Sequence, residues 1–498
     1  MPRQVIPIPH PKRIPVLQNL FSIDIKRPIY SVSQLALDYY PIMELKYPNG
    51  EKLVFVTSQE LCKEVCDESR FKKNINYVVE RLKPVIGEGL FTSQTDSLDW
   101  EIPHRILLKG FSQKGMKAFH PYMIKTSREL IDRWNNLPED TYINLTTDMT
   151  NVTLETIGLC GFNYKFDSLK TAAPHPFIKA LLSSLRFVME SIAIPEFINK
   201  LRFKKVKKFN IDTAYMYQLV DKVITERKNN PEKYEGIHDL LNIMLNTQDN
   251  VTGTYLKTNE IRDQIITLLI AGHETTSGML SYAFYSIIKH PEVAKKAYAE
   301  VDEVLGKDLT INPEYSQINK LKYIKQILSE SLRLCPTGVS FAVEPKEDTI
   351  IGNKYAVKKG QSIQVLLTSL HVQENAWGKD ALKFNPENFS SDNAKKIPSH
   401  VYKPFGNGQR SCLGKHFALH EATLIIGLVL QRYHLFLEEG YQLQIQETLT
   451  IKPKDLKIRL QKRTHNNSEN KTTSNSEKTE HKINNSKCPY DHGSDSAN

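Results

Sequence analysis

Cys412 is the residue whose surroundings in the sequence most clearly indicate chemistry. It lies in the glycine-rich run FGNGQRSCLG, which begins at Phe405 and ends at Gly414, just before an apolar helical segment. The N-terminus of a helix and the nearby Arg410 place positive potential beside the sulfur, so both favour the thiolate over the thiol. The glycines permit tight backbone geometry and let a flat ligand approach closely. We therefore predict that this turn presents a reactive cysteine to a ligand.

A second candidate group interrupts an apolar helical segment, in the run AGHETT from Ala271 to Thr276. The hydroxyl of Thr275 can bond the carbonyl of Ala271 one turn earlier, and Gly272 weakens the helix locally. Such a helix can open and admit water or oxygen. Taken by itself, the pattern is equally compatible with a buried helix that carries a polar patch.

The segments around these two groups are mainly helical. Helices are expected from an N-cap at Thr258 to just before Pro291, over LKYIKQILSESLRL up to Pro336, and from Leu413 to about Gln431. Strands are expected in DTIIG and SIQVLLT, and in IMELKY and EKLVFV, which flank an Asn-Gly turn. The expected fold class is mainly α with a minor β region.

Composition separates a folded part of the chain from a polar end. The 498 residues carry a net charge of +10, and 40% hydrophobic residues suffice for a sizeable core. Residues 463–498 are nearly free of apolar side chains, so we expect a disordered polar tail after a folded domain of residues 1–462. The tail carries five basic and five acidic residues, so the excess positive charge belongs to the folded domain. That excess favours an acidic partner, which could be nucleic acid, a membrane surface or a protein.

Cysteine usage and apolar runs restrict the compartment and the kind of metal site. The six cysteines are too scattered for a disulfide framework, which is typical of a reducing compartment. Cys62 and Cys66 lie one helical turn apart, but no CxxC pair or histidine cluster accompanies them, so zinc is not expected. No uninterrupted apolar run of about 18 residues occurs, and a cytoplasmic protein without a membrane span is expected.

The Cys412 turn is similar at every position to the haem-binding signature of the cytochrome P450 family, Phe-x-x-Gly-x-Arg-x-Cys-x-Gly. The resemblance implies a single-domain cytochrome P450 fold that binds haem b, with Cys412 as the proximal ligand of the iron. Arg410 would contact a haem propionate, and Phe405 would pack beside the sulfur. The AGHETT segment resembles the oxygen-activation helix of the family, in which Glu274 and Thr275 would relay protons.

The resemblance extends to side chains that would surround the haem. Trp100 and His104 lie at positions i and i+4, so one helix face could present an indole N–H and an imidazole to the propionates. Lys73 corresponds in position to a further propionate ligand. These three residues, with Arg410, form the predicted polar rim of the cofactor.

A helical carboxylate and arginine also resemble a family feature. Most pairs at the spacing of Glu330 and Arg333 are solvated contacts worth a few tenths of a kcal/mol. These two lie on a helix with a strong apolar face and resemble the Glu-x-x-Arg network that supports the haem core. Asn388 stands where the second arginine of that network is usual, so we expect other contacts to hold this loop.

From about residue 5 to 460 the chain most resembles the haem domain of the bacterial self-sufficient P450–reductase fusions that hydroxylate fatty acids. Segments outside the general signature are also similar, among them CDESRFKKN, PHPFIKAL and FALHEATL. Four residues correspond to pocket positions near the haem: Phe91, Ala271, Gly338 and Ser340. Their lining suits a long apolar chain.

The head-group end of the expected pocket differs from that of the resembling enzymes. In those proteins an arginine and a tyrosine on the first hairpin bind the carboxylate of the fatty acid, and Glu51 and Phe55 stand at these places. A carboxylate repels the head group, and phenylalanine has no hydroxyl donor. We expect an acyl chain whose head group is not held as a free acid in the usual way.

The resemblance implies a monooxygenase that hydroxylates a hydrophobic, fatty-acyl-chain substrate with O2. Since only the polar tail follows the haem domain, electrons are expected from a separate flavodoxin or ferredoxin with its reductase, and no nucleic acid is needed to account for the charge. An Arg-Pro pair in place of Glu274 and Thr275 would instead indicate a peroxide-driven enzyme. A peroxide-driven hydroxylase and a non-catalytic haem-thiolate sensor are the alternative hypotheses.

Overall fold

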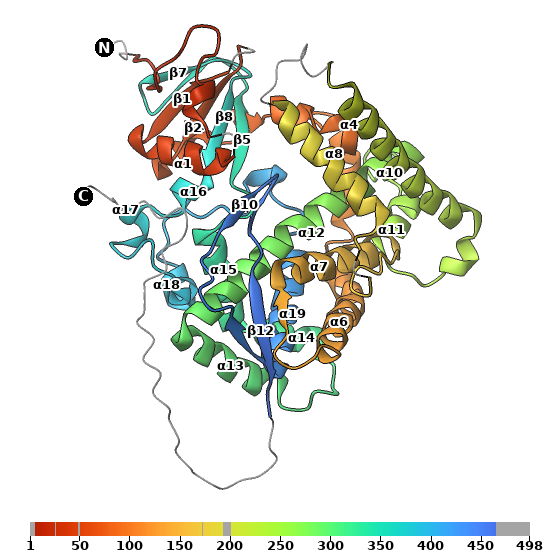
Figure 1. Cartoon of the computed structure of the whole chain (residues 1–498). Coiled ribbons are helices and arrows are strands. Elements are labelled where there is room, and N and C mark those ends of the chain that lie inside the picture. The colour runs from red at the N-terminus through yellow and green to blue at the C-terminus, as the bar shows by residue number, and fades with distance from the viewer. Residues whose placement is uncertain (1–4, 25, 48–49, 172, 193–200, 465–498) are drawn as a thin grey trace.

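A single long helix, α12 (Thr258–Lys289), forms the centre of the molecule. It runs through the middle of the helical body in Figure 1, where α7 (Leu145–Phe162), α15 (Lys322–Leu334) and α19 (Lys415–Arg432) contact it. Buried residues occur on nearly every face of α12, as expected for a helix in the interior of a large domain.

The other helices surround this central group. The computed structural model describes residues 5–24, 26–47, 50–171, 173–192 and 201–464. The further α-helices in these ranges are α1 (Pro28–Asp38), α2 (Gln59–Val65), α3 (Tyr77–Glu80), α4 (Lys83–Ile86), α5 (Leu98–Leu108), α6 (Gln113–Asn135), α8 (Pro176–Ile192), α10 (Phe203–Asn229), α11 (Leu240–Asn246), α13 (Pro291–Leu305), α14 (Tyr315–Lys320), α16 (Leu367–Leu370), α17 (Glu374–Trp377) and α18 (Ser391–Ala394). Mainly helical architecture with little sheet is confirmed.

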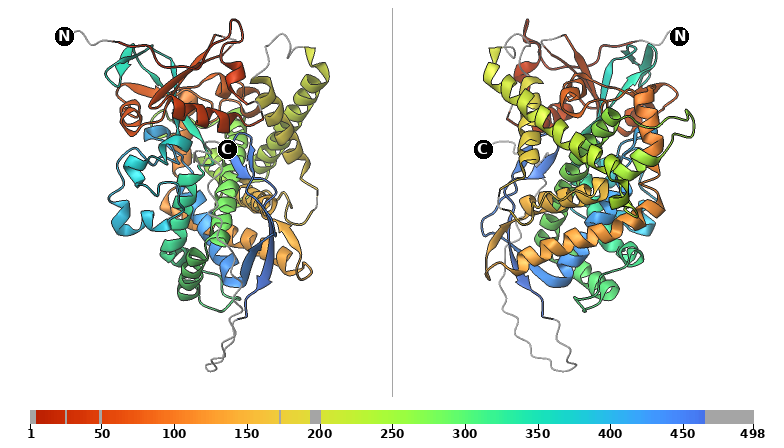
Figure 2. Two further views of the ribbon diagram at one scale, coloured as in Figure 1. Left: turned by 60° about the vertical axis from the view of Figure 1, so that its left-hand side comes forward. Right: turned by 90° about the vertical axis from the view of Figure 1, so that its right-hand side faces the viewer.

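The largest sheet has five strands in the order β1-β2-β8-β5-β3. Its strands are β1 (Ile42–Lys46), β2 (Lys52–Val56), β8 (Ser362–Leu366), β5 (Ser340–Pro345) and β3 (Phe71–Lys73). Only the β2–β8 pair is parallel, and the other three are antiparallel. The sheet lies at the upper left of the molecule in Figure 1, beside α8 and α10, and it is also at the top in both views of Figure 2.

Small sheets complete the strand content of the described residues. They are β4 (Tyr142–Asn144) with β12 (Lys457–Lys462) and β9 (Tyr433–Leu437), β10 (Ile445–Glu447) with β11 (Ile451–Pro453), and β6 (Thr349–Ile351) with β7 (Tyr355–Val357). Strand β11 packs against α12, which places a chain segment near residue 450 beside the middle of the sequence.

Hydrophobic burial follows this division into helices and sheet. One large core joins the helices, whereas two smaller clusters cover the two faces of the five-stranded sheet. Val54 and Val56 of β2 belong to one face, and Leu53 and Phe55 belong to the other, because side chains alternate along a strand.

The expected helix limits differ slightly from those observed. Thr258 is the first helical residue and Lys257 is the N-cap, because the Lys257 N–H donates to the Glu260 carboxylate at 2.8 Å. The last long helix begins at Lys415 rather than Leu413, since Gly414 occupies the N-cap position. The expected hairpin is confirmed by the antiparallel β1–β2 pair, although Pro48 and Asn49 of its turn lie outside the described residues.

The described residues near the C-terminus can be compared with the predicted boundary between the folded domain and the tail. Arg463, which we placed at the start of the tail, forms an ion pair with Asp302 at 2.7 Å. The predicted disorder of the remaining tail concerns residues that lie outside the described ranges from 465 onward. Across the described ranges, no helix has the length and apolarity needed to cross a membrane.

Candidate active site

The turn that carries Cys412 is fixed by its glycines and by α2. Gly406 and Gly408 have φ values of 79° and 57°, in the left-handed region that favours glycine. A Cβ atom on Gly408 would lie 2.1 Å from the carboxylate of Glu68, whose Oε1 accepts the Gln409 N–H at 2.9 Å. The Cys412 N–H also donates to a backbone carbonyl, that of Phe405, at 2.8 Å. The turn is therefore built tightly, as its glycine content predicts.

The sulfur of Cys412 is accessible although protein surrounds it. Cys412 is exposed, yet burial raises the pKa of its thiol, while the Gly414 N–H and the Lys415 ammonium lower it. The Cys412 sulfur is thus accessible but poorly hydrated, which favours binding of a ligand that covers it. Our expectation that Arg410 would favour the thiolate is not met, because Arg410 points to other partners and Lys415 supplies the positive charge instead.

Arg410 joins the Cys412 turn to the segment before α5. Its guanidinium donates to the carbonyls of Leu90 at 2.9 Å and Ser93 at 3.1 Å. The same group lies 4.6 Å from the centre of the Trp100 ring, a cation–π contact. Burial lowers the pKa of Arg410 to about 10. The predicted propionate ligand is therefore a desolvated cation held against Trp100.

Lys73 and His104 lie in the electrostatic field of Arg410. The Lys73 ammonium donates to the Phe91 carbonyl at 2.5 Å, and the rings of Trp100 and His104 stack with centroids 4.4 Å apart. Burial and then Arg410 lower the pKa of both Lys73 and His104. No carboxylate of the described residues contributes to the shifts of these groups.

Two mutually repelling, poorly hydrated cations, such as Lys73 and Arg410, are costly to hold together unless an anion lies near them. The two propionates of haem b would supply the negative charge that these side chains lack, and Cys412 would supply the thiolate that the iron requires. Trp100, His104, Lys73 and Arg410 thus come together as predicted. The residues present fit haem b, and these four side chains would hold its propionates.

The middle of α12 carries the expected hydroxyl arrangement. The Thr275 hydroxyl donates to the Ala271 carbonyl at 2.7 Å, as the spacing predicts. Ala271 is exposed and Thr275 is half-buried, so this face of α12 is open. Gly272 faces the other way: a Cβ atom there would lie 2.9 Å from Ile157 of α7. The glycine therefore permits close packing of α12 on α7.

Glu274 lies in an ion pair that the sequence did not indicate. Its carboxylate contacts the Lys452 ammonium of β11 at 2.8 Å and the His273 ring nitrogen at 3.2 Å. Burial alone would raise the pKa of Glu274, but Lys452 and His273 together hold it well below its ordinary value. Glu274 is therefore an ionised carboxylate. Lys452 was missed because only the packing of β11 on α12 brings it here.

The residues that the resemblance places in the substrate pocket differ in their exposure. Phe91 is 41% exposed, and a Cβ atom on Gly338 would meet no atom within 4 Å. Ser340 is half-buried, and its hydroxyl donates to Gln364 at 3.2 Å. Phe55 is only 6% exposed and packs in the sheet cluster, so its predicted place in the pocket is not evident from its packing. Open space therefore lies near Phe91 and Gly338.

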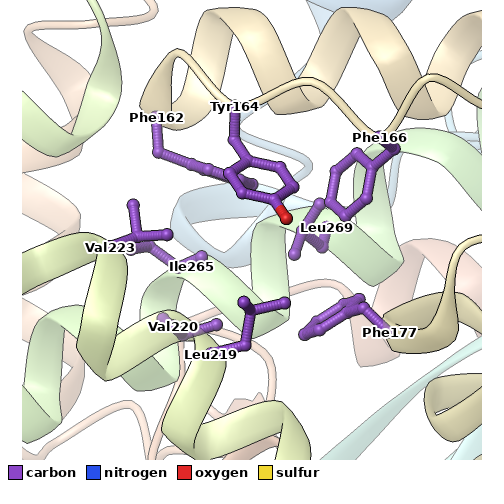
Figure 3. Close-up of a pocket in the computed structure, with 9 residues that line it drawn as sticks. All are labelled: Phe162, Tyr164, Phe166, Phe177, Leu219, Val220, Val223, Ile265 and Leu269. Carbon is purple, nitrogen blue, oxygen red and sulfur yellow. The ribbon is translucent and has the colours of Figure 1, made fainter.

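A small apolar pocket that the sequence did not indicate lies beside α12. Figure 3 shows its lining, in which Ile265 and Leu269 of α12 face residues of α10 and aromatic rings from the segment after α7. The Tyr164 hydroxyl contacts His175 at 3.4 Å. This pocket shares no residue with the predicted site.

The Glu330–Arg333 pair is completely buried, with a shortest contact of 2.7 Å. Arg333 also donates to the carbonyls of His371 and Ala381, which belong to the segment that follows β8. Asn388 donates to Glu330 at 3.2 Å. The expectation that other contacts replace the missing arginine is confirmed, since the Asn388 amide occupies that place.

Removing the Asn388 amide tests this substitution. Asn388→Ala should lower the free energy of unfolding by about 1–2 kcal/mol, because a buried carboxylate loses a hydrogen-bond donor. Urea unfolding followed by far-UV circular dichroism measures the change. Asn393→Ala is the matched control, since its amide bonds an exposed backbone carbonyl, and it should change stability by less than about 0.5 kcal/mol. Equal effects of the two variants would contradict the role of Asn388.

Comparison with known proteins agrees with this site and identifies the class of protein. The sequence profile of the cytochrome P450 family matches residues 8–460. The chain belongs to the cytochrome P450 family, whose members bind haem through a cysteine thiolate, and its cofactor is haem b.

The similar curated proteins are bifunctional or self-sufficient enzymes. The chain is 46% identical over 461 residues to bifunctional cytochrome P450/NADPH–P450 reductase 2 of Bacillus subtilis, covering 93% of this chain and 43% of that protein. A bifunctional cytochrome P450/NADPH–P450 reductase of Bacillus cereus is 45% identical, with 92% and 42% covered. A self-sufficient cytochrome P450 monooxygenase of Exserohilum turcicum is 38% identical, with 93% and 43% covered. The chain thus spans less than half the length of these relatives.

Proposed function

We propose that this chain is a haem-thiolate monooxygenase that inserts one oxygen atom into a C–H bond of a hydrophobic acyl chain. The observation that carries the proposal is the combination of an accessible Cys412, four clustered rim side chains whose pKa shifts involve no carboxylate of the described residues, and an open hydroxyl-bearing face of α12. Bound haem supplies the activation of dioxygen, which a thiolate ligand favours. The protein supplies the ligand, the position of the substrate and the protons.

Thr275 and Glu274 have different roles in proton handling under this proposal. The Thr275 hydroxyl donates its hydrogen bond to the Ala271 carbonyl, so its oxygen can only accept a hydrogen bond from water or substrate. Glu274 is ionised and paired with Lys452, so it has no proton to donate, and its lowered pKa makes it a weak proton acceptor while this pair persists. Proton delivery therefore requires that Glu274 exchange its contact with Lys452 for a proton from solvent.

The net charge of +10 supports electron delivery by an acidic protein. We propose a flavodoxin or ferredoxin with its reductase as the donor, supplied as a separate chain. Such a partner approaches a basic surface by long-range attraction, and the rate of approach falls as salt screens the charges.

Turnover with surrogate partners tests the proposed activity. Haem-loaded protein mixed with flavodoxin, its reductase, NADPH and a saturated acyl substrate should consume NADPH in a substrate-dependent way and release hydroxylated product. Product formed with hydrogen peroxide alone, and not with the partners and O2, would indicate the peroxide-driven enzyme. Substrate binding without either kind of turnover would indicate a sensor.

The acyl-chain assignment is supported by the resemblance of the chain and by the open space near Phe91 and Gly338. The head-group end differs from a simple acid-binding site. Glu51 accepts the Tyr77 N–H at 3.4 Å, and Lys52, the neighbouring cation, contacts Glu44 at 3.4 Å instead. A neutral or amidated head group therefore suits this entrance better than a free carboxylate.

Reversing the charge at Glu51 tests that preference. Glu51→Arg should tighten the binding of a free fatty acid by about 5–30-fold, since it replaces a repulsion with an attraction, and leave the matching fatty alcohol within about twofold. Spectral titration of the Soret band measures both affinities. Glu439→Arg, an equal charge change at an exposed position after β9, is the control and should alter neither. Equal binding of acid and alcohol by the unmodified protein would contradict the preference.

A further inference from the structure

Two thiols and an imidazole converge beside the Cys412 turn. Cys62 and Cys66 belong to α2 and its C-cap, and His400 lies in the segment that leads to Phe405. One potential ligand atom from each residue lies within 4.8 Å of the other two. The sequence showed only the cysteine pair, because the histidine is brought to it by the tertiary fold.

The spacing of the two sulfurs suits a shared metal ion. The Sγ atoms of Cys62 and Cys66 are 3.9 Å apart. Two thiolates on one tetrahedral zinc, each with a bond of about 2.3 Å, lie about 3.8 Å apart. A disulfide requires about 2.05 Å, so the two residues are free thiols in this arrangement. Both thiols are buried, so zinc here would be shielded from solvent.

His400 has a conformation and a hydrogen-bonding state that call for a partner. Its φ angle is 65°, in the left-handed region that non-glycine residues rarely adopt. Its Nδ1 atom is buried and has no hydrogen-bond partner among the described residues. Burial, Lys403 and Lys63 lower the pKa of His400, so the ring is neutral, the form that binds metals.

We propose that Cys62, Cys66 and His400 bind a zinc ion. Thiolate and imidazole are the ligands that zinc prefers, and three protein ligands leave the fourth position to water. Binding releases the two thiol protons and involves no oxidation or reduction, so the ion and the two thiolates together are neutral. The hydrogen bond between the two thiols and then burial raise the pKa of Cys62, whereas the same hydrogen bond lowers the pKa of Cys66, and the Lys403 ammonium acts to lower both.

A zinc ion at this place would join α2 to the haem-binding turn. The Asn407 amide already donates to the Cys66 carbonyl at 3.0 Å, and Glu68, just after the cysteine pair, binds the Gln409 N–H. The metal would add a third connection, through His400, to the same contact between α2 and residues 400–410. We therefore expect zinc to stabilise this contact against heat without entering the reaction.

The test uses haem-loaded protein that carries Cys488→Ser, which removes the tail thiol as a competing ligand. After incubation with zinc chloride and removal of the excess, the metal content and the zinc K-edge absorption spectrum are measured. We expect one zinc per chain, two sulfur ligands at about 2.3 Å, and a higher thermal midpoint than in the zinc-free protein. The ferrous CO spectrum checks independently that the haem site is intact.

Two variants and a control decide the outcome. Cys62→Val should weaken zinc binding at least 100-fold and His400→Asn about 10-fold, both with an unchanged CO spectrum. Cys160→Ala, which removes a buried thiol of α7, should bind zinc like the parent protein. Undiminished zinc in Cys62→Val or His400→Asn, less than one zinc in the parent, or a Cys62–Cys66 disulfide found by mass spectrometry would each overturn the proposal.

Discussion

Replacing Cys412 with serine is expected to abolish the red-shifted Soret band of the ferrous CO complex and to reduce hydroxylation below about 1% of the original rate. The band and the activity would both depend on a thiolate ligand of the haem iron, and a hydroxyl does not donate electron density in the same way. Loss of an outer-shell partner of a metal ligand already costs about 10–100-fold, so loss of the ligand itself costs more. The difference spectrum between the reduced protein with and without CO measures the first effect, and product formation measures the second.

Ser411→Ala is the matched control for this experiment. It changes the residue next to Cys412 and leaves both the thiol and the glycines of the turn in place. It should keep the thiolate band and most of the activity. A thiolate spectrum that persists in Cys412→Ser would contradict the assignment of the iron ligand.

The second large effect concerns Lys452. Lys452→Met is expected to lower the free energy of unfolding by about 3–5 kcal/mol at neutral pH, because it leaves the buried Glu274 carboxylate without a lysine partner, beside only His273 and the Thr450 hydroxyl. The product formed per NADPH should not fall, since Glu274 then takes up the proton that the proposed relay requires without first leaving Lys452. Urea unfolding and a product-to-NADPH ratio measure these changes.

The pH dependence of the effect has a definite sign. The folded-state pKa of Glu274 is lowered, so its ion pair contributes stability that is fully present above the ordinary carboxyl pKa of about 4.3. This contribution is lost as the pH falls below that value toward the lowered folded-state pKa. The stability difference between the parent protein and Lys452→Met should therefore shrink in acid.

Two further variants isolate the ion pair. Lys454→Met removes an exposed ammonium from the residues just after β11 and should change stability by less than about 0.5 kcal/mol. Adding Glu274→Gln to Lys452→Met should restore much of the lost stability, because no unpaired charge then stays buried. A double variant as unstable as Lys452→Met would show that Lys452 acts through packing rather than through Glu274.

Features that depend on neighbours in the sequence were predicted from the sequence. The Cys412 turn, the Thr275 bond to Ala271 and the shared helix face of Trp100 and His104 each involve residues within about one helical turn or one loop. Local backbone geometry fixes such contacts once the helix or turn forms. The helix limits followed from prolines and glycines for the same reason, and they were displaced only where a cap moved the boundary, as at Lys415.

Contacts between distant segments were decided only by the tertiary structure. Lys452 reaches Glu274 because β11 packs on α12, Arg410 turns to the Leu90 carbonyl, and His400 reaches the cysteines of α2. Buried polar groups are usually hydrogen-bonded, so each of these residues is expected to have a partner. Its position in the sequence does not indicate which residue that partner is. The sequence by itself therefore determined which chemistry the protein carries. The packing decided which charged groups shift the pKa values of the site residues, because electrostatic interactions depend on distance in space.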